Sequence, residues 1–401
     1  MIANVGSFVY ILVLARLLKP FDYATVFVFV SLLNLLVAPA NILQLTVVSL
    51  VSEAKGKNTL HQLSGLKTYF LQKLGFTSLI VLLVYLLSQG YINDFLKVNN
   101  PIYLLITVAT FIAFLFLVLF RSILQGLLHL EAFFASSVLE MVTKVSLVVI
   151  TSLAGLAVFG ALFSYFLCLA LTLLFTFWRF SKVKLPKKPS SFESKNVLKI
   201  IIPASFLMLG LTSFYTTDVI LAKHFLSASS AALYSGLSTL GKIVFFANFG
   251  VAASLLPLST ERHSRGNKTS KIFLASLGLV LVICFFFSAT YFLFPQYVLL
   301  ILGRAEYQAA KGLVSLFAIF ASLVSLNFLL GTFIFSVRKL SVSYLVFAAA
   351  VVQGVGIFFY HSDLAEVILV SIATSFILLL VLAFYTYSFF SKKFQHVNSK
   401  I

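Results

Sequence analysis

The chain has 401 residues, of which 61% are hydrophobic and only 10% are charged. Soluble domains carry about a quarter charged residues, so this composition excludes a soluble protein and indicates a polytopic membrane protein. The net charge of +18 would suit a nucleic-acid partner, but the positions of the charges along the chain argue against one.

The apolar runs predict an all-α protein with about twelve transmembrane helices. Only helices and closed barrels satisfy every backbone polar group in a bilayer, and these runs are continuous instead of alternating in ten-residue strands. The first run is short, so we expect the natural chain to begin upstream of Met1. The predicted spans are 2–18, 24–50, 69–88, 101–126, 132–154, 158–180, 198–223, 231–258, 272–294, 309–336, 341–360 and 365–389.

Lys and Arg are distributed unequally between the alternate loops of these spans. One side carries 21 of the 29 basic residues, the other side carries six, and two lie inside spans. The positive-inside rule places the richer side in the cytoplasm, together with both chain ends, as expected for a bacterial cytoplasmic (inner) membrane protein. Membrane topology and contact with anionic lipids therefore account for most of the positive charge, and nucleic acid is not expected as a partner.

The two halves of the chain share an outline. The segment 14–58 is repeated in outline at 221–267. Leu14-Ala15-Arg16 matches Leu221-Ala222-Lys223, and each copy ends in a loop that contains acidic and basic residues. Duplication on this scale is how many transporters are built. The predicted divisions are an N-terminal six-helix lobe, a cytoplasmic linker and a C-terminal six-helix lobe, at 1–185, 186–197 and 198–401.

Motifs of soluble enzymes are missing from the sequence. It contains no glycine-rich phosphate loop, no histidine or cysteine pair at metal-ligand spacing, and no nucleophile elbow. The two cysteines, Cys168 and Cys284, both lie inside apolar runs, which argues against a disulfide framework. The sequence therefore predicts a protein that is not an enzyme and that holds no cofactor and no metal.

A few ionisable side chains fall inside predicted spans, where a charge must face a cavity or a partner. Glu140 and Lys144 are four residues apart, which fits either a self-neutralising pair or a cavity wall whose pairing changes during transport. Lys242 falls near the middle of its span, with Ser235 on the same helix face. Asp218 is the one acidic candidate close to Lys242 in sequence. It suits either an interfacial acid or a cation, proton or sugar site.

Neutral polar side chains accompany these charges. Asn34 and Asn41 share one span, where they suit either a hydrogen bond between helices or a polar cavity wall. Tyr215 lies in the most polar stretch of any span, and Arg16 closes the first span as a snorkelling anchor or as part of an outer mouth. The candidate cavity residues are Lys242, Lys144, Arg16, Asn34, Asn41, Tyr215 and Ser235.

Short segments follow one another along the chain in a specific order. They are Ala15-Arg16-Leu17-Leu18-Lys19-Pro20-Phe21-Asp22-Tyr23, Ser52-Glu53-Ala54-Lys55-Gly56, Leu124-Gln125-Gly126-Leu127, Pro203, Asp218-Val219-Ile220-Leu221-Ala222, Tyr234-Ser235-Gly236, Leu256-Pro257-Leu258-Ser259, and Gly303 with Tyr307 and Ala310. Together they resemble the Wzx-type polysaccharide flippases of the multidrug/oligosaccharidyl-lipid/polysaccharide exporter superfamily. The chain departs from that pattern where Lys19 and Ala24 replace glycines.

The resemblance implies two six-helix lobes that form a V around a central cavity. It also implies alternating-access translocation of an undecaprenyl-pyrophosphate-linked oligosaccharide, for the synthesis of O-antigen, capsule or exopolysaccharide. Asp218 or Glu140 would then couple transport to H+ or Na+. The expected partners are the lipid-linked substrate and membrane lipids, with a polysaccharide polymerase and a chain-length regulator as further candidates.

Two alternative functions stay open on the sequence. A cation-coupled exporter of small molecules would share the same fold, although its site would favour buried carboxylates over a lysine in mid-membrane. A membrane polysaccharide polymerase is less favoured, because its catalytic groups need large external loops and the loops here are short.

Overall fold

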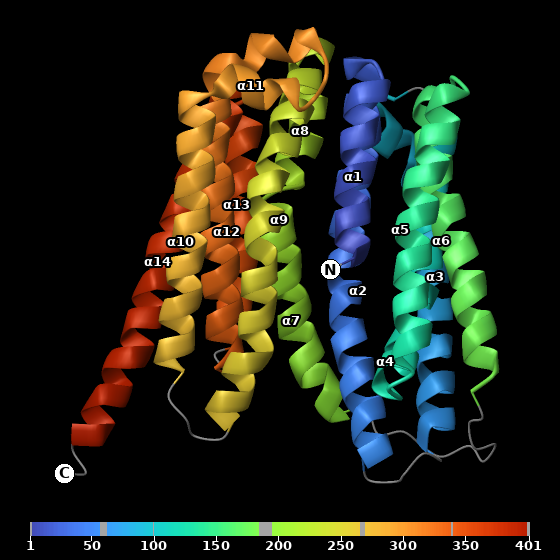
Figure 1. Ribbon diagram of the computed structural model, residues 1–401, viewed down its shortest axis with the longest axis vertical. Helices are drawn as coiled ribbons and strands as arrows, with labels where there is room; N and C mark the ends of the chain where they lie inside the picture. Colours follow the sequence, from blue (N-terminus) through green and yellow to red (C-terminus); the bar gives the residue numbers. More distant parts are fainter. Residues whose placement is uncertain are drawn as a thin grey trace. The chain divides into compact units, whose positions relative to one another are not determined.

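The computed structural model describes residues 2–56, 62–98, 100–183, 195–264, 269–337 and 340–398, and every regular element in these ranges is a helix (Figure 1). The chain separates into two compact units, Met1–Ile202 (unit 1) and Pro203–Ile401 (unit 2). The linker predicted at 186–197 lies outside the described residues apart from its last three, which begin a helix.

Unit 1 contains long helices that follow one another along the chain. The central helix is α4, which packs on both α2 and α6, while α5 packs on α1 and α6. The helices of this unit are α1 (Ile2–Leu17), α2 (Pro20–Gly56), α3 (Gln62–Phe95), α4 (Ile102–Gly126), α5 (Leu130–Leu153) and α6 (Ala157–Ser181).

Unit 2 repeats this arrangement with two additions. Its central helix is α12, which packs on α9, α14 and α10 as α4 packs on its neighbours in unit 1. The additions are a break in the first span and a pair of short helical segments before α12. The helices are α7 (Lys195–Ser213), which enters unit 2 at Pro203, α8 (Thr217–Phe225), α9 (Ala228–Ser264), α10 (Ser270–Leu293), α11 (Pro295–Leu300), η1 (Ala305–Leu313), α12 (Val314–Ser336), α13 (Val342–Phe359) and α14 (Leu364–Asn398).

The prediction of an all-α polytopic membrane protein is confirmed. Ten of the described helices are long and apolar enough to cross a bilayer, and the pair α7–α8 adds an eleventh span if the two cross as one. The first helix, α1, has 16 residues and falls short of a full span, as its short apolar run predicts. The predicted count of about twelve therefore includes one short helix and one broken helix.

The break between α7 and α8 was not predicted, because the segment 198–223 reads as one continuous span. The two helices are bent by 46° around residues 214–216. Hydroxyl groups compete with the helix here, since Thr216 donates to the Thr212 carbonyl at 2.9 Å and the Ser213 and Thr217 hydroxyls lie 2.6 Å apart. The backbone N–H of Tyr215 donates to Thr212 only three residues back, which tightens this turn and ends α7.

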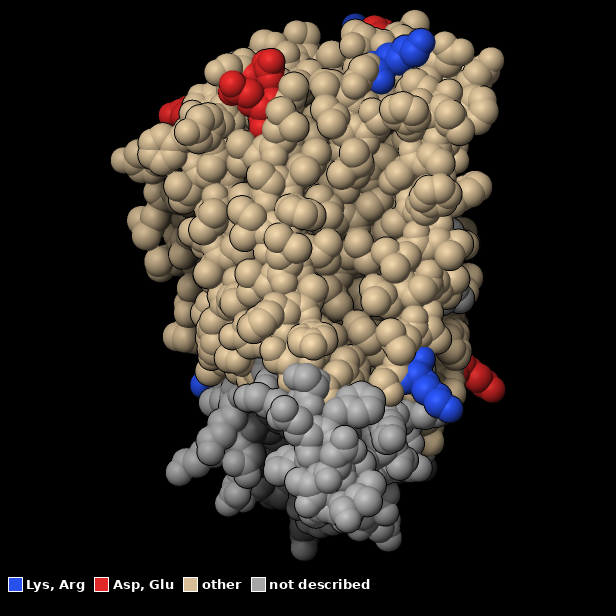
Figure 2. Space-filling view, turned by 90° about the vertical axis from the view of Figure 1, so that its left-hand side faces the viewer, with Lys and Arg blue, Asp and Glu red and all other residues tan. Residues whose placement is uncertain are grey.

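The outer surface of the helices is apolar between two charged ends. Figure 2 shows a wide band that is free of Lys, Arg, Asp and Glu on the face it presents. The helices α3 and α10 occupy equivalent places in the two halves, and in the most apolar stretch of each only 17% of the residues are buried. The figure is 61% both for α4 and for the span Ala305–Ser336, which contains α12. We infer that α3 and α10 contact lipid and that α4 and α12 form the cores of their units.

Gly210 offers a test of helix packing within unit 2. A Cβ atom at this position would lie 2.8–2.9 Å from backbone atoms of Val346 and Phe347 on α13. Because backbone cannot yield as a side chain can, we expect Gly210→Ala to lower the free energy of unfolding by about 1–3 kcal/mol. Thermal unfolding in detergent measures the loss, with Gly278→Ala on α10 as the control, since its Cβ would meet nothing within 4 Å. Equal melting temperatures for the two variants would contradict the close approach of α7 and α13.

Candidate functional site

Asp218 lies in the first turn of α8, directly after the break in the span, and its side chain is fully buried. The Tyr234 hydroxyl donates to its Oδ2 atom at 2.8 Å. Within the described part of the chain, the Oδ1 atom accepts no hydrogen bond. A buried carboxylate with an oxygen that accepts no hydrogen bond can hold a proton or a small cation.

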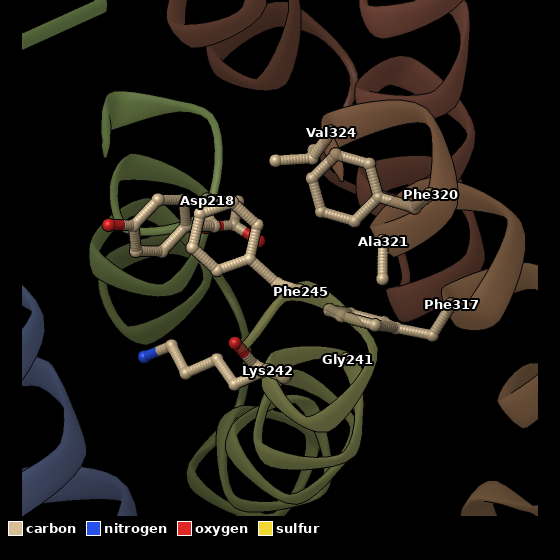
Figure 3. A pocket seen from close by; sticks show the side chains of 10 residues that line it. Asp218, Gly241, Lys242, Phe245, Phe317, Phe320, Ala321 and Val324 are labelled. Atoms are coloured by element: carbon tan, nitrogen blue, oxygen red, sulfur yellow. The ribbon is translucent and has the colours of Figure 1, made fainter. Parts of the chain in front are cut away.

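A small cavity adjoins this carboxylate. It measures about 20 Å³, which is enough for about one water molecule and too small for a sugar. Figure 3 shows aromatic side chains from α12 on one side of it, with Asp218 and Lys242 from α8 and α9 opposite. The lining residues are Tyr215, Asp218, Ser238, Gly241, Lys242, Phe245, Phe317, Phe320, Ala321 and Val324.

Lys242 reaches the same cavity from α9 and is only 3% exposed. Asp218, the acidic neighbour that the sequence left open, lines the same cavity. Gly241, next to it, carries no side chain because a Cβ atom would lie 2.7 Å from the Phe317 ring. The close packing of α9 on α12 therefore fixes Lys242 at the cavity edge.

A chain of buried polar groups connects Asp218 to two further helices. Tyr234, the donor to Asp218, lies near Ser371 on α14, and the Ser371 hydroxyl receives a 3.0 Å bond from the Gln353 amide on α13. The same amide donates to the Phe214 carbonyl at 3.3 Å, within the break of the span. The network thus stabilises both the break and the carboxylate. Neither Gln353 nor the Tyr234 hydroxyl was among the candidate site residues.

Unit 1 holds a second cluster, made of three charged side chains. Glu140 accepts from Arg121 at 2.6 Å through one carboxylate oxygen and from Lys144 at 3.0 Å through the other. The predicted pairing of Glu140 with Lys144 is therefore present. Arg121 was not among the candidate site residues, but it lies on the buried face of α4 and is only 8% exposed.

Neutral groups complete this three-charge cluster. Arg121 also donates to the Ser136 hydroxyl at 2.8 Å and to the Ser136 carbonyl at 2.7 Å. The Ser136 and Thr176 hydroxyls lie 2.6 Å apart, which joins α5 to α6. The Lys144 ammonium lies 4.2 Å from the centre of the Tyr165 ring, close enough for a cation–π interaction. Charge and hydrogen bonds therefore connect α4, α5 and α6 at one buried point.

Of the remaining predicted site residues, only Tyr215 belongs to one of these two groups of residues. Arg16, in the last turn of α1, and Asn41 on α2 are exposed, while Asn34 is half-buried. Ser235 is buried, and its hydroxyl donates to the Ala231 carbonyl one turn earlier instead of lining the cavity. Tyr215 lines the cavity beside Asp218 and Lys242. Among the described residues, no group of three His, Cys, Asp or Glu side chains is arranged to hold a metal ion.

A family comparison places the chain among known sequences. The profile of a family described as "Polysaccharide biosynthesis protein" matches residues 1–261, which is more than half of the chain. The chain belongs to this family. The match confirms the resemblance to Wzx-type proteins that the ordered segments indicate. No curated protein matches the chain in sequence.

Solved structures similar to this polysaccharide biosynthesis family member include several transporters. One is an inward-facing multidrug resistance MATE family transporter of the MOP superfamily, with a TM-score of 0.79, 15% identity and coverage of 96% of this chain and 94% of that one. An outward-facing multidrug resistance MATE family transporter has a TM-score of 0.69 and 16% identity, with coverage of 97% of this chain and 94% of that one. A MOP superfamily transporter from Pyrococcus furiosus has a TM-score of 0.64 and 17% identity, with coverage of 96% of this chain and 91% of that one. At these identities, the similarity establishes a MATE-like transporter fold and no more.

Proposed function

We propose that this protein is a flippase that moves an undecaprenyl-pyrophosphate-linked oligosaccharide across the cytoplasmic membrane by alternating access. The observation that carries the proposal is the burial of cationic side chains in both units of a polysaccharide biosynthesis family member, at Lys242 in unit 2 and at Lys144 in unit 1. A buried ammonium suits the phosphate groups of such a lipid. A buried ammonium would repel the organic cations that a drug exporter carries.

The substrate contacts divide by chemistry. Lys242, Lys144 and Arg16 would attract the pyrophosphate, while the polyprenyl tail stays in the lipid. The sugar hydroxyls would be hydrogen-bonded by the neutral candidates Asn34, Asn41, Tyr215 and Ser235. Because the cavity beside Lys242 has room for only about one water, substrate entry requires the side chains that line it to move apart.

Asp218 is the better candidate for coupling transport to an ion. Glu140 has both carboxylate oxygens occupied by Arg121 and Lys144, whereas Asp218 retains an open Oδ1 atom beside a water-sized cavity. H+ and Na+ both fit an open carboxylate oxygen of this kind. The proposed coupling ion is therefore one of these two, bound at Asp218.

Asp218→Asn tests the coupling, because the amide keeps the size of the side chain and removes its charge. We expect the variant to flip substrate at a rate that no longer responds to an imposed H+ or Na+ gradient, with at least about a tenfold loss of the gradient effect. Flipping in proteoliposomes with and without each gradient measures this. The control is Asp363→Asn, at an exposed position before α14. An unchanged gradient response in Asp218→Asn would exclude this residue as the coupling site.

The proposed setting is a bacterial inner membrane, with both chain termini in the cytoplasm and a polysaccharide polymerase and a chain-length regulator as partners. Deletion of the gene in its native cell tests the function. A flippase defect should accumulate single lipid-linked repeat units that face the cytoplasm. Accumulation of units that already face outward would instead indicate a polymerase and contradict the proposal.

A cation-coupled exporter of small molecules is the second candidate. It is favoured by the similarity to two multidrug resistance MATE family transporters and by the buried carboxylate of Asp218. Uptake of organic cations into inverted membrane vesicles, lost in Asp218→Asn, would support it. Absence of uptake, together with complementation of a flippase-deficient strain, would favour the flippase.

A further inference from the structure

Two short helical segments, α11 and η1, lie at one end of unit 2 and join α10 to α12 (Figure 1). Hydrogen bonds hold them together, since the Gln308 amide donates to the Gln296 carbonyl at 3.1 Å and the Lys311 ammonium donates to the Gln296 side-chain oxygen at 3.3 Å. Tyr307 of η1 is fully buried, and its ring packs on Gly236 of α9, where a Cβ atom would lie 2.6 Å from it. The position of α11 on unit 2 is therefore fixed.

The helix α11 has one buried side and one exposed apolar side. Val298 and Leu299 are buried against unit 2. Tyr297 and Leu300 project from the opposite side of the helix and are 61% and 59% exposed. The exposed apolar surface continues back into the last turn of α10 through Phe294, whose ring centre lies 6.3 Å from that of Tyr297. This aromatic patch consists of Phe292, Leu293, Phe294, Tyr297 and Leu300.

The aromatic patch is continuous with the lipid-facing surface of α10. Phe285 lies seven residues before Phe292, on the same face of the helix, and both side chains are exposed. The 24 residues of α10 extend about 36 Å, which exceeds a hydrocarbon core of about 30 Å. No charged residue occurs between Lys271 and Arg304. The end of α10 and all of α11 therefore suit the boundary between acyl chains and headgroups, where aromatic side chains are enriched.

We propose that α11 and the last turn of α10 form an interfacial anchor, in which the aromatic patch inserts into the boundary between the headgroups and the acyl chains of the lipid. Lipid is the expected occupant because the patch extends a helix face that lipid covers, and its one polar side-chain group is the Tyr297 hydroxyl. An apolar ring with a polar tip suits the wet edge of a bilayer. With both chain termini in the cytoplasm, as proposed above, this is the outer leaflet.

The anchor is a feature of unit 2. In unit 1, the described residues between α3 and α4 form no helical segment of this kind. An amphipathic segment that lies in the interface resists movement along the membrane normal, because its apolar side would enter water and its polar side would enter lipid. We therefore expect the anchor to fix the depth of unit 2 in the bilayer. This role is separate from the proposed transport of a lipid-linked substrate.

Fluorescence quenching in a lipid bilayer tests the anchor. Trp178 is the single tryptophan of the chain, so Trp178→Phe provides a silent background for one reporter. Tyr297→Trp places the reporter in the aromatic patch, and Glu306→Trp places it at an exposed position of η1 as the control. The full-length protein is reconstituted in phosphatidylcholine vesicles, and the quenchers are lipid brominated high on the acyl chain and iodide on both sides of the membrane. We expect brominated lipid to quench Tyr297→Trp at least about twofold more than Glu306→Trp, and iodide to show the reverse order.

Each other outcome would overturn the anchor. Equal quenching of the two reporters by iodide, with no effect of brominated lipid on Tyr297→Trp, would show that the patch faces water. Protection of Tyr297→Trp from both quenchers would show that a protein surface, such as a second copy of the chain, covers the patch. Should Tyr297→Trp not fold, Leu300→Trp places the reporter in the same patch and carries the same expectation. The measurement needs no transport, so failure of the proposed function leaves it unaffected.

Discussion

Replacing Lys242 with alanine is expected to reduce transport about a hundredfold, because truncation removes a buried cation and leaves the Asp218 carboxylate without it. Both residues line the same cavity in unit 2. The loss should appear in strains that lack their own flippase, as a failure to restore surface polysaccharide, and in proteoliposomes as a reduced flipping rate.

Two companion variants make this result specific. Lys242→Arg retains the charge and should keep transport within about tenfold of the wild type. Lys271→Ala removes the same charge from an exposed position in the first turn of α10 and should transport normally. Transport by Lys242→Ala at the wild-type rate would exclude a cationic substrate site in unit 2.

Glu140→Gln is expected to cause the largest stability loss of any single substitution in unit 1. The change leaves Arg121 and Lys144 as two buried cations without a counter-charge, and breaking buried pairs in this way costs about 3–5 kcal/mol. Unfolding in a graded series of detergent mixtures measures the loss. Trp178, the single tryptophan of the chain, lies near the end of α6 and reports on unit 1 by its fluorescence.

The control for Glu140→Gln lies on the same helix. Glu131→Gln changes the same side chain in the exposed first turn of α5, where we expect a loss below about 1 kcal/mol. Adding Lys144→Met to Glu140→Gln removes one of the unpaired cations and should recover part of the stability. A loss as small in Glu140→Gln as in Glu131→Gln would show that the three charges are not effectively buried.

Much of the fold follows from the sequence because a bilayer permits few solutions. Long apolar runs must become helices, and the lengths of the runs gave most of the spans to within a few residues. The short first helix was predicted, because the first apolar run is short. The break between α7 and α8 was not, since Thr212, Ser213 and Thr216 are tolerated inside continuous helices, and only the hydrogen bonds between them reveal the turn.

The candidate site was only partly predictable for a different reason. Spacing along one helix gave the pair of Glu140 and Lys144, because i and i+4 residues share a face. Arg121 comes from another helix, and its place near the end of a span made it resemble a loop charge. Tyr234 and Gln353 are ordinary residues of apolar spans, and only the packing of α8, α9, α13 and α14 brings them to Asp218. Contacts between helices of this kind leave no periodic signal in a single sequence.

The most direct test of the proposed function is the flipping of a defined substrate by the purified protein. Undecaprenyl-pyrophosphate carrying a labelled oligosaccharide is placed in both leaflets of proteoliposomes, and an impermeant enzyme that cleaves exposed sugar is added outside. The proposal predicts that nearly all of the label becomes accessible with the wild type, and that only the outer half, about 50%, does so with Lys242→Ala over the same time. Accessibility that stays at the outer half with the wild type, under every imposed gradient of H+ or Na+, would contradict it.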